Sequence, residues 1–80
     1  MSSDEIFKSV AQSIADILGV EVDNIDMDAE MDSLGLNELT EVEMIMSLED
    51  KIGIKIPEED MKHALSGRRF AEYIYMRMKK

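Results

Sequence analysis

The chain has 80 residues, of which 18 are acidic, 9 are basic and none is cysteine. This length predicts one domain spanning residues 1–80, and the lack of cysteine excludes disulfides, thiolate nucleophiles and cysteine zinc sites. No apolar run approaches the length of a membrane span, and the N-terminus lacks the features of a secretory signal. We therefore expect a soluble, cytoplasmic, monomeric protein.

The charge is distributed unevenly along the chain. Residues 21–60 contain 14 acidic and 2 basic side chains, whereas residues 61–80 contain 6 basic and 1 acidic. The acidic middle repels phosphate, so we expect no nucleic-acid binding there and favour partners with basic docking surfaces. The basic segment suits either a helix C-terminus, through the macrodipole, or contact with an anionic surface. Its main members are Arg68, Arg69, Arg77, Lys79 and Lys80.

The first predicted element is a helix over residues 3–18. Ser2 and Glu5 have the spacing of a capping box, and Gly19 suits a left-handed helix end. Between them, apolar residues recur at helical spacing, namely Ile6, Val10, Ile14, Ile17 and Leu18. Residues 20–35 are predicted to form a long loop, whose scattered apolar side chains we expect to pin it to the core.

A second helix follows, and its sequence leaves open whether it begins near Leu34 or near Glu38. Its apolar stripe is broad, which predicts a central helix that touches more than one neighbour. Gly53 is predicted to end it. The stripe consists of Leu39, Val42, Met44, Ile45, Met46, Leu48 and Ile52.

The last part of the chain predicts a short third helix and a longer fourth. Pro57 suits the first turn of the third helix, which we expect to reach Ala64 or Leu65. Ser66 can cap the fourth helix. No strand pattern appears, so the predicted fold is all-α, a four-helix bundle with three longer helices and one short third helix. The inner face of the fourth helix is predicted to carry Phe70, Tyr73, Ile74 and Met78.

The sequence does not indicate an enzyme. His63 is the only histidine, and no nearby motif supplies the positioned partner that a catalytic base needs. The serines at positions 9, 13 and 47 have no triad-like context. We therefore expect no catalytic residue.

Residues 26–32 alternate carboxylates with other side chains, which suggests calcium binding. An EF-hand loop needs glycine at its sixth position and glutamate at its twelfth. Counted from Asp26, those positions hold Met31 and Asn37, so the motif fails. We expect a solvated acidic loop and no metal site.

Four short motifs in the centre of the chain carry a family resemblance. The run Leu34-Gly35-Leu36-Asn37-Glu38-Leu39 is followed by Val42-Glu43, Leu48-Glu49 and Ile56-Pro57. This resembles acyl carrier proteins, whose pattern is L-G-x-D-S-L, then V-E, L-E and I-P. In that family the serine carries a 4′-phosphopantetheine arm, whose thiol holds an acyl group as a thioester. The resemblance implies the carrier fold and partners among enzymes of fatty-acid, polyketide or lipid biosynthesis.

The sequence departs from the family at the reactive position. The family's D-S pair falls on Asn37 and Glu38, and a glutamate has no hydroxyl to form the phosphodiester. Asp32-Ser33-Leu34 is another D-S-L tripeptide, so we compared both serine positions with the helix pattern that should follow. Offsets of +1, +4, +6, +7, +8, +10 and +14 from Glu38 are all apolar, whereas five of the seven are polar from Ser33. The pattern places Glu38 at the family's serine position. Ser33 remains the fallback, since patterning fixes a helix face better than its ends.

Partner enzymes of this family bind the acidic face of the second helix. By resemblance, the docking positions in this chain are Leu39, Val42, Glu43, Met46, Glu49 and Asp50. Complementary charge on such a face mainly sets specificity and association rate. The alternative is that these residues form an ordinary solvated helix face.

Three functions are consistent with these observations. The domain is an armless carrier homologue that needs no cofactor and docks to acyl-chain biosynthetic enzymes, with Glu38 crudely imitating a negative group. Alternatively, it is a working carrier with 4′-phosphopantetheine on Ser33, attached by a phosphopantetheinyl transferase. In the third hypothesis the carrier fold serves another contact, through the basic last helix with Arg68 and Arg69.

Overall fold

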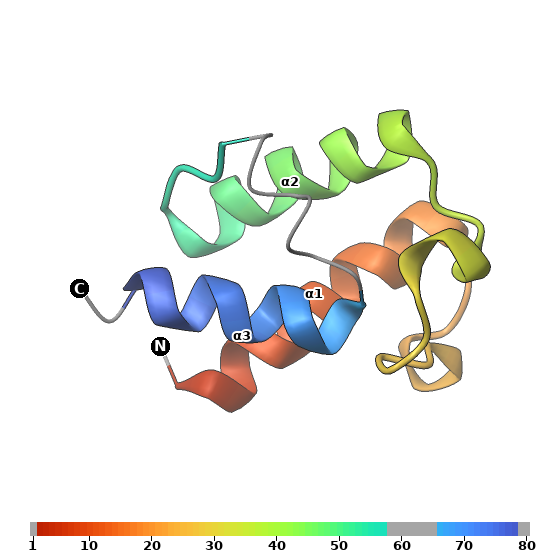
Figure 1. Ribbon diagram of the computed structural model, residues 1–80, viewed down its shortest axis with the longest axis horizontal. Helices are drawn as coiled ribbons and strands as arrows, with labels where there is room; N and C mark the ends of the chain where they lie inside the picture. The colour runs from red at the N-terminus through yellow and green to blue at the C-terminus, as the bar shows by residue number, and fades with distance from the viewer. Residues whose placement is uncertain (1, 58–65, 79–80) are drawn as a thin grey trace.

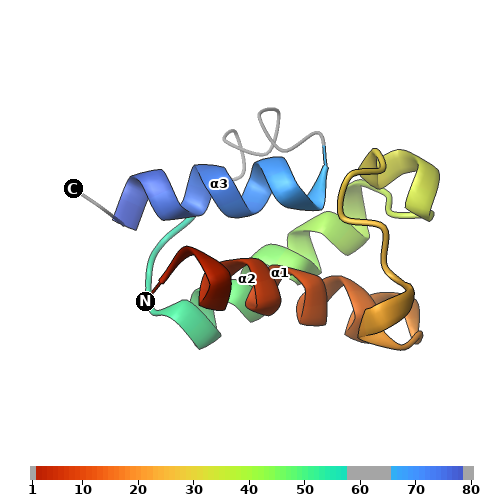
Figure 2. The same ribbon diagram turned by 90° about the horizontal axis from the view of Figure 1, so that it is seen from below.

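The computed structural model describes residues 2–57 and 66–78, and these residues form an all-α fold (Figure 1). The helices α2 and α3 run in the same general direction, opposite to α1 (Figures 1 and 2). Within the described ranges the β structure is one isolated bridge, between Glu30 and Ser66, so the predicted fold class is confirmed. The expected short helix after Pro57, and His63, lie outside these ranges. The elements are α1 (Ser3–Leu18), η1 (Val22–Asn24), η2 (Met31–Leu34), α2 (Glu38–Ile52) and α3 (Gly67–Met78), where η denotes a 3-10 helix.

Both ends of α1 are as predicted. The Ser2 hydroxyl accepts a hydrogen bond from the Glu5 N–H at 3.2 Å, and Glu5 Oε1 accepts one from the Ser2 N–H at 3.0 Å. The bonds from Ser2 lower the pKa of Glu5. At the other end Gly19 has a φ of 70°, a conformation that costs glycine little because it has no Cβ.

The helix α2 begins at Glu38, which answers the question that its sequence left open. Asn37 is the N-cap: its side-chain oxygen accepts from the Thr40 N–H at 2.9 Å, and the Thr40 hydroxyl accepts from the Asn37 N–H at 2.8 Å. These reciprocal bonds satisfy backbone donors that a helix start leaves unpaired. Gly53 ends α2, as predicted.

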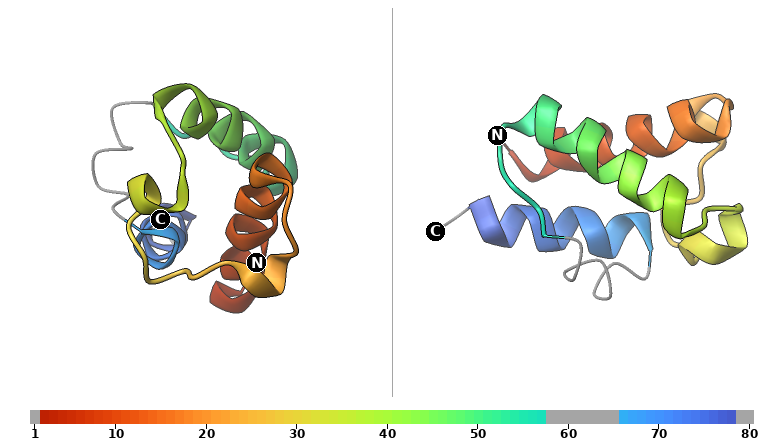
Figure 3. Two further views of the ribbon diagram at one scale, coloured as in Figure 1. Left: turned by 90° about the vertical axis from the view of Figure 1, so that its right-hand side faces the viewer. Right: turned by 90° about the horizontal axis from the view of Figure 1, so that it is seen from above.

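The core lies between the three α-helices, and α1 packs against both α2 and α3 (Figure 3). The buried part of α2 is narrower than its apolar stripe. Leu39 is 70% exposed and Met46 is 61% exposed, so these two expected docking positions lie outside the core. The broad stripe predicted that α2 is the central helix, whereas α1 is the helix that packs against both others. The fully buried side chains include Ile6, Val10, Ile14, Met31, Met44, Leu48, Phe70 and Ile74.

Two methionines pin the long loop to the core. Met27 and Met31 are 7% and 2% exposed, whereas Val20 is 46% exposed and does not contribute. Met27 also lies against the start of α3, where a Cβ on Gly67 would be 2.8 Å from the Met27 sulfur. A side chain at position 67 would therefore collide with the buried methionine.

Arg68 fastens the same loop to α3. Its backbone N–H donates to the Met27 carbonyl at 2.8 Å, and its guanidinium forms an ion pair with Asp28. The guanidinium carbon also lies 5.2 Å from the centroid of the Phe7 ring. Hydrogen bonding to Asp28, together with its charge, raises the pKa of Arg68. One residue thus joins the loop, α1 and α3.

The start of α3 confirms one prediction and corrects another. The Ser66 hydroxyl accepts a hydrogen bond from the Arg69 N–H at 3.2 Å, as expected of a cap. Arg68 and Arg69, however, lie in the first turn of α3, and Arg77 is the basic residue of its last turn. The explanation by the C-terminal macrodipole therefore fails for the first two.

Candidate functional site

The start of α2 concentrates negative charge. Glu38 is exposed and is the first residue of the helix. Glu41, in the same first turn, is half-buried, and burial raises its pKa, as do the charges of Asp32 and Glu38. The first turn of α2 therefore presents exposed carboxylate but no hydroxyl of its own except that of Thr40, which is engaged in the cap.

Ser33 lies outside α2, in the 3-10 helix η2 that precedes it. The residue is exposed, and its hydroxyl donates a hydrogen bond to the Glu30 carbonyl at 2.7 Å. Gly35 follows with a φ of 95°, so the chain turns sharply between η2 and α2. Ser33 and Glu38 consequently belong to different elements with different backbone geometry.

Four residues form the α2 outer stripe, defined as Leu39, Glu43, Met46 and Asp50. Their spacing of i, i+4, i+7 and i+11 keeps them on one face, because an α-helix advances by about 100° per residue. All four are exposed, and the face opposite holds the buried Met44, Ile45 and Leu48. The stripe therefore alternates an exposed apolar side chain with an exposed carboxylate along α2.

The other two expected docking residues differ from this stripe. Val42 is half-buried at its edge. Glu49 is also half-buried, and its Oε2 accepts a hydrogen bond from the Ile56 N–H at 2.7 Å. Glu49 thus holds the segment that follows α2, a structural role that the sequence pattern did not indicate.

The acidic loop is organised by local contacts. Asp26 Oδ1 accepts a hydrogen bond from the Asp28 N–H at 3.0 Å, and Asp28 pairs with Arg68. Among residues 2–57 and 66–78, no three carboxylate or imidazole groups gather closely enough to hold a metal ion. In the same part of the chain, no helix has the length and apolar character needed to cross a bilayer.

The family comparison agrees with this architecture. The family described as "Phosphopantetheine attachment site" matches residues 8–74, most of the chain. The chain belongs to this family. An "Acyl carrier protein" from Campylobacter hominis is 32% identical over 71 residues, which cover 88% of this chain and 90% of the relative. The resemblance to acyl carrier proteins is therefore confirmed, and a carrier-type role rather than an enzymatic one is in keeping with it.

Proposed function

We propose that this carrier-family domain is a docking module without a prosthetic arm. In this proposal Glu38 occupies the family's serine position, and no 4′-phosphopantetheine is attached. The single observation that supports it is the start of α2: Asn37 and Glu38, where the apolar pattern puts the family's D-S pair, are the N-cap and first residue of the helix. A carboxylate at that point cannot become a phosphodiester.

The α2 outer stripe is the surface that we propose for docking. Leu39 and Met46 would be buried by a partner, and their exposure makes apolar area available for that purpose. Glu43 and Asp50 would face lysine and arginine on the partner and set its orientation and rate of approach. The partners proposed are enzymes of fatty-acid, polyketide or lipid biosynthesis with basic docking surfaces.

The carboxylates at the start of α2 give Glu38 a further role in this proposal. Glu38 and Glu41 place two carboxyl groups in the first turn of the helix without modification. A partner whose basic groups bind a phosphodiester in modified relatives would meet a carboxylate here. The imitation is crude, because a carboxylate matches the single charge of a phosphodiester but is smaller and has no arm attached.

Intact mass measurement tests the proposal directly. The protein, Glu38→Ser and Glu38→Ala are each incubated with coenzyme A, magnesium and a promiscuous phosphopantetheinyl transferase, beside a control carrier that is fully converted. We expect no mass change for the parent or Glu38→Ala, and the gain of one phosphopantetheine for Glu38→Ser. A folded but unmodified Glu38→Ser would show that more than the serine has been lost, and Asn37→Asp in that background would test the neighbouring position.

A second function has one observation in its favour. Ser33 is exposed within its own D-S-L tripeptide, so its hydroxyl is accessible once the bond to the Glu30 carbonyl is released. In this alternative Ser33 carries 4′-phosphopantetheine and the domain shuttles thioester intermediates. A parent protein that gains the arm, and a Ser33→Ala variant that does not, would establish it and overturn the armless proposal.

The third hypothesis, a contact through Arg68 and Arg69, has less support. The guanidinium of Arg68 already pairs with Asp28 and lies over Phe7. A partner anion would have to compete with these internal contacts. Under the docking proposal, we expect that neutralising Arg69 alone leaves binding to a biosynthetic enzyme unchanged.

A further inference from the structure

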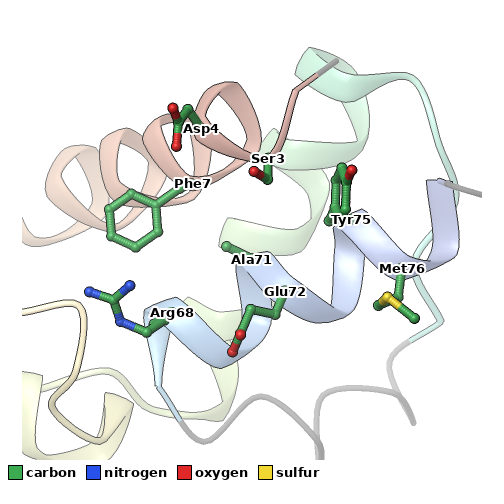
Figure 4. A pocket seen from close by; sticks show the side chains of 8 residues that line it. All are labelled: Ser3, Asp4, Phe7, Arg68, Ala71, Glu72, Tyr75 and Met76. Carbon is green, nitrogen blue, oxygen red and sulfur yellow. The ribbon is translucent and has the colours of Figure 1, made fainter.

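A groove lies between α1 and α3 (Figure 4), and α2 contributes none of its lining residues. Its volume is about 520 Å³, within the range typical of ligand and side-chain pockets. We call it the α1–α3 groove. It is lined by Ser3, Asp4, Phe7, Arg68, Ala71, Glu72, Tyr75 and Met76.

The groove has apolar walls and acidic rims. In Figure 4, Phe7 and Tyr75 stand toward opposite ends, with Ala71 between them. Asp4 of α1 and Glu72 of α3 lie on opposite sides of this space, and both residues are exposed. Met76, beside Glu72, is 61% exposed and extends the apolar surface. A ligand in the groove would therefore contact an aromatic ring toward each end, Ala71 between them, and a carboxylate on each side.

The cation within the groove is already balanced. Arg68 is paired with Asp28, which does not line the groove. The charge of Glu72 also acts on Arg68. Among the lining residues, two carboxylates, Asp4 and Glu72, thus stand beside one cation that is already paired. An anionic ligand would be repelled, whereas a cationic one would be attracted.

Aromatic rings beside carboxylates suit an ammonium or guanidinium group. The ring faces attract cations, the carboxylates accept charge-assisted hydrogen bonds, and the aliphatic stem of lysine or arginine packs along apolar atoms. The protein already makes one such contact, since the Arg68 guanidinium carbon lies 5.2 Å from the Phe7 centroid. We propose that the α1–α3 groove docks a polypeptide partner through an arginine or lysine flanked by apolar side chains.

This surface is separate from the α2 outer stripe. The stripe lies on the face of α2 opposite the buried side chains, and the groove lies between the other two helices. The inference therefore goes beyond the proposed docking function and does not depend on it. A domain with both surfaces can hold one partner on α2 and another segment between α1 and α3.

Amide chemical-shift mapping with a defined probe tests the inference. The probe is a short helical peptide with one arginine between leucines, and the matched ligand has citrulline in place of that arginine. We expect saturable shifts at Phe7, Ala71, Glu72 and Met76 with the arginine peptide. The citrulline peptide should bind about two- to fivefold more weakly, as expected for an exposed charge pair.

Matched variants separate the two surfaces. The double variant Asp4→Asn with Glu72→Gln should weaken binding in the groove by about two- to fivefold for each charge removed. Glu72→Gln alone leaves the N-terminus of α1 intact and should weaken it by about two- to fivefold. Glu43→Gln with Asp50→Asn removes the same charge from α2 and should leave groove affinity unchanged. Four outcomes would each overturn the inference. They are shifts confined to α2, shifts spread evenly over the acidic surface, no saturable binding, and an equal loss of affinity in both variant pairs. Binding at α2 in the same titration reports on the docking proposal independently.

Discussion

Replacing Ser13 with alanine is expected to stabilise the protein. Ser13 is 1% exposed in α1, and its hydroxyl has no hydrogen-bond partner within the part of the chain that the structure describes. An unpaired buried hydroxyl costs about 1–3 kcal/mol. Alanine also has the better helix propensity, by up to about 0.5 kcal/mol. Removing the oxygen also loses its van der Waals contacts, at about 0.1–0.2 kcal/mol for each contacting atom pair, and this loss offsets only part of the gain. We expect a net increase in the free energy of unfolding of about 1–2 kcal/mol.

Thermal and urea denaturation measure this gain. For a domain of this size, 1 kcal/mol corresponds to a rise in Tm of about 4–8 °C. Ser9→Ala is the matched control, because Ser9 is only half-buried on the same helix and reports the propensity effect without the desolvation term. A Ser13→Ala variant that is less stable than the parent, beside a neutral Ser9→Ala, would refute the reasoning. It would mean that the Ser13 hydroxyl has a partner in solution.

Three further predictions concern α2. Leu48→Ala should lower the free energy of unfolding by about 2–5 kcal/mol, because the Leu48 side chain is 0% exposed. Leu39→Ala should lower it by less than about 1 kcal/mol, because Leu39 is 70% exposed. Similar urea midpoints for the two variants would contradict the orientation of the helix. Burial raises the folded-state pKa of Glu41, so the contribution of this residue to the free energy of unfolding should fall as pH rises through that pKa. Glu41→Gln should therefore be more stable than the parent by up to about 1 kcal/mol at pH 7, and this difference should vanish at acidic pH. Denaturation of both proteins across the pH range measures it. Glu49→Ala should cost about 1–2 kcal/mol through the lost bond to the Ile56 N–H, while Glu49→Gln keeps an acceptor and should cost less; equal losses in urea would argue against that bond.

Local signals in the sequence were sufficient to predict the ends of two helices. Ser2, Glu5 and Gly19 act within a few residues of one another, so their spacing alone indicates where α1 begins and ends. Gly53 likewise indicates where α2 ends, whereas the sequence left its start open between Leu34 and Glu38, and only the structure places it at Glu38. An apolar pattern identifies the face of a helix better than its first residue, because the stripe can begin before or after the first hydrogen-bonded turn.

The same pattern overestimated the core. Apolarity at Leu39 and Met46 indicates that these side chains avoid water in some state, but not whether they do so within the domain or against a partner. The offset test counted both residues with the buried ones as one apolar stripe, although the family resemblance places them on the docking face. Their exposure, on the side of α2 opposite Leu48, shows that they are not buried within the domain, and this can be seen only in a structure.

Long-range contacts were also beyond the sequence pattern. Arg68 was assigned to a basic helix end, yet it pairs with Asp28, forty positions earlier. Glu49 was placed on the docking face because it matches a family position, whereas its carboxylate binds the Ile56 N–H. Each partner follows from the path of the chain between the elements and not from helical periodicity.

The fastening of the loop by Arg68 has a consequence for the order of folding during synthesis. The loop and α1 leave the ribosome well before α3, but Met27 and Asp28 obtain these contacts only when the last helix arrives. The nascent chain can form local helices and pack α1 against α2 early, yet the loop and the other face of α1 wait for α3. Such distant pairings slow folding relative to bundles built from neighbouring hairpins. Loss of the last helix by premature termination would therefore release the loop as well, and leave one face of α1 open to aggregation.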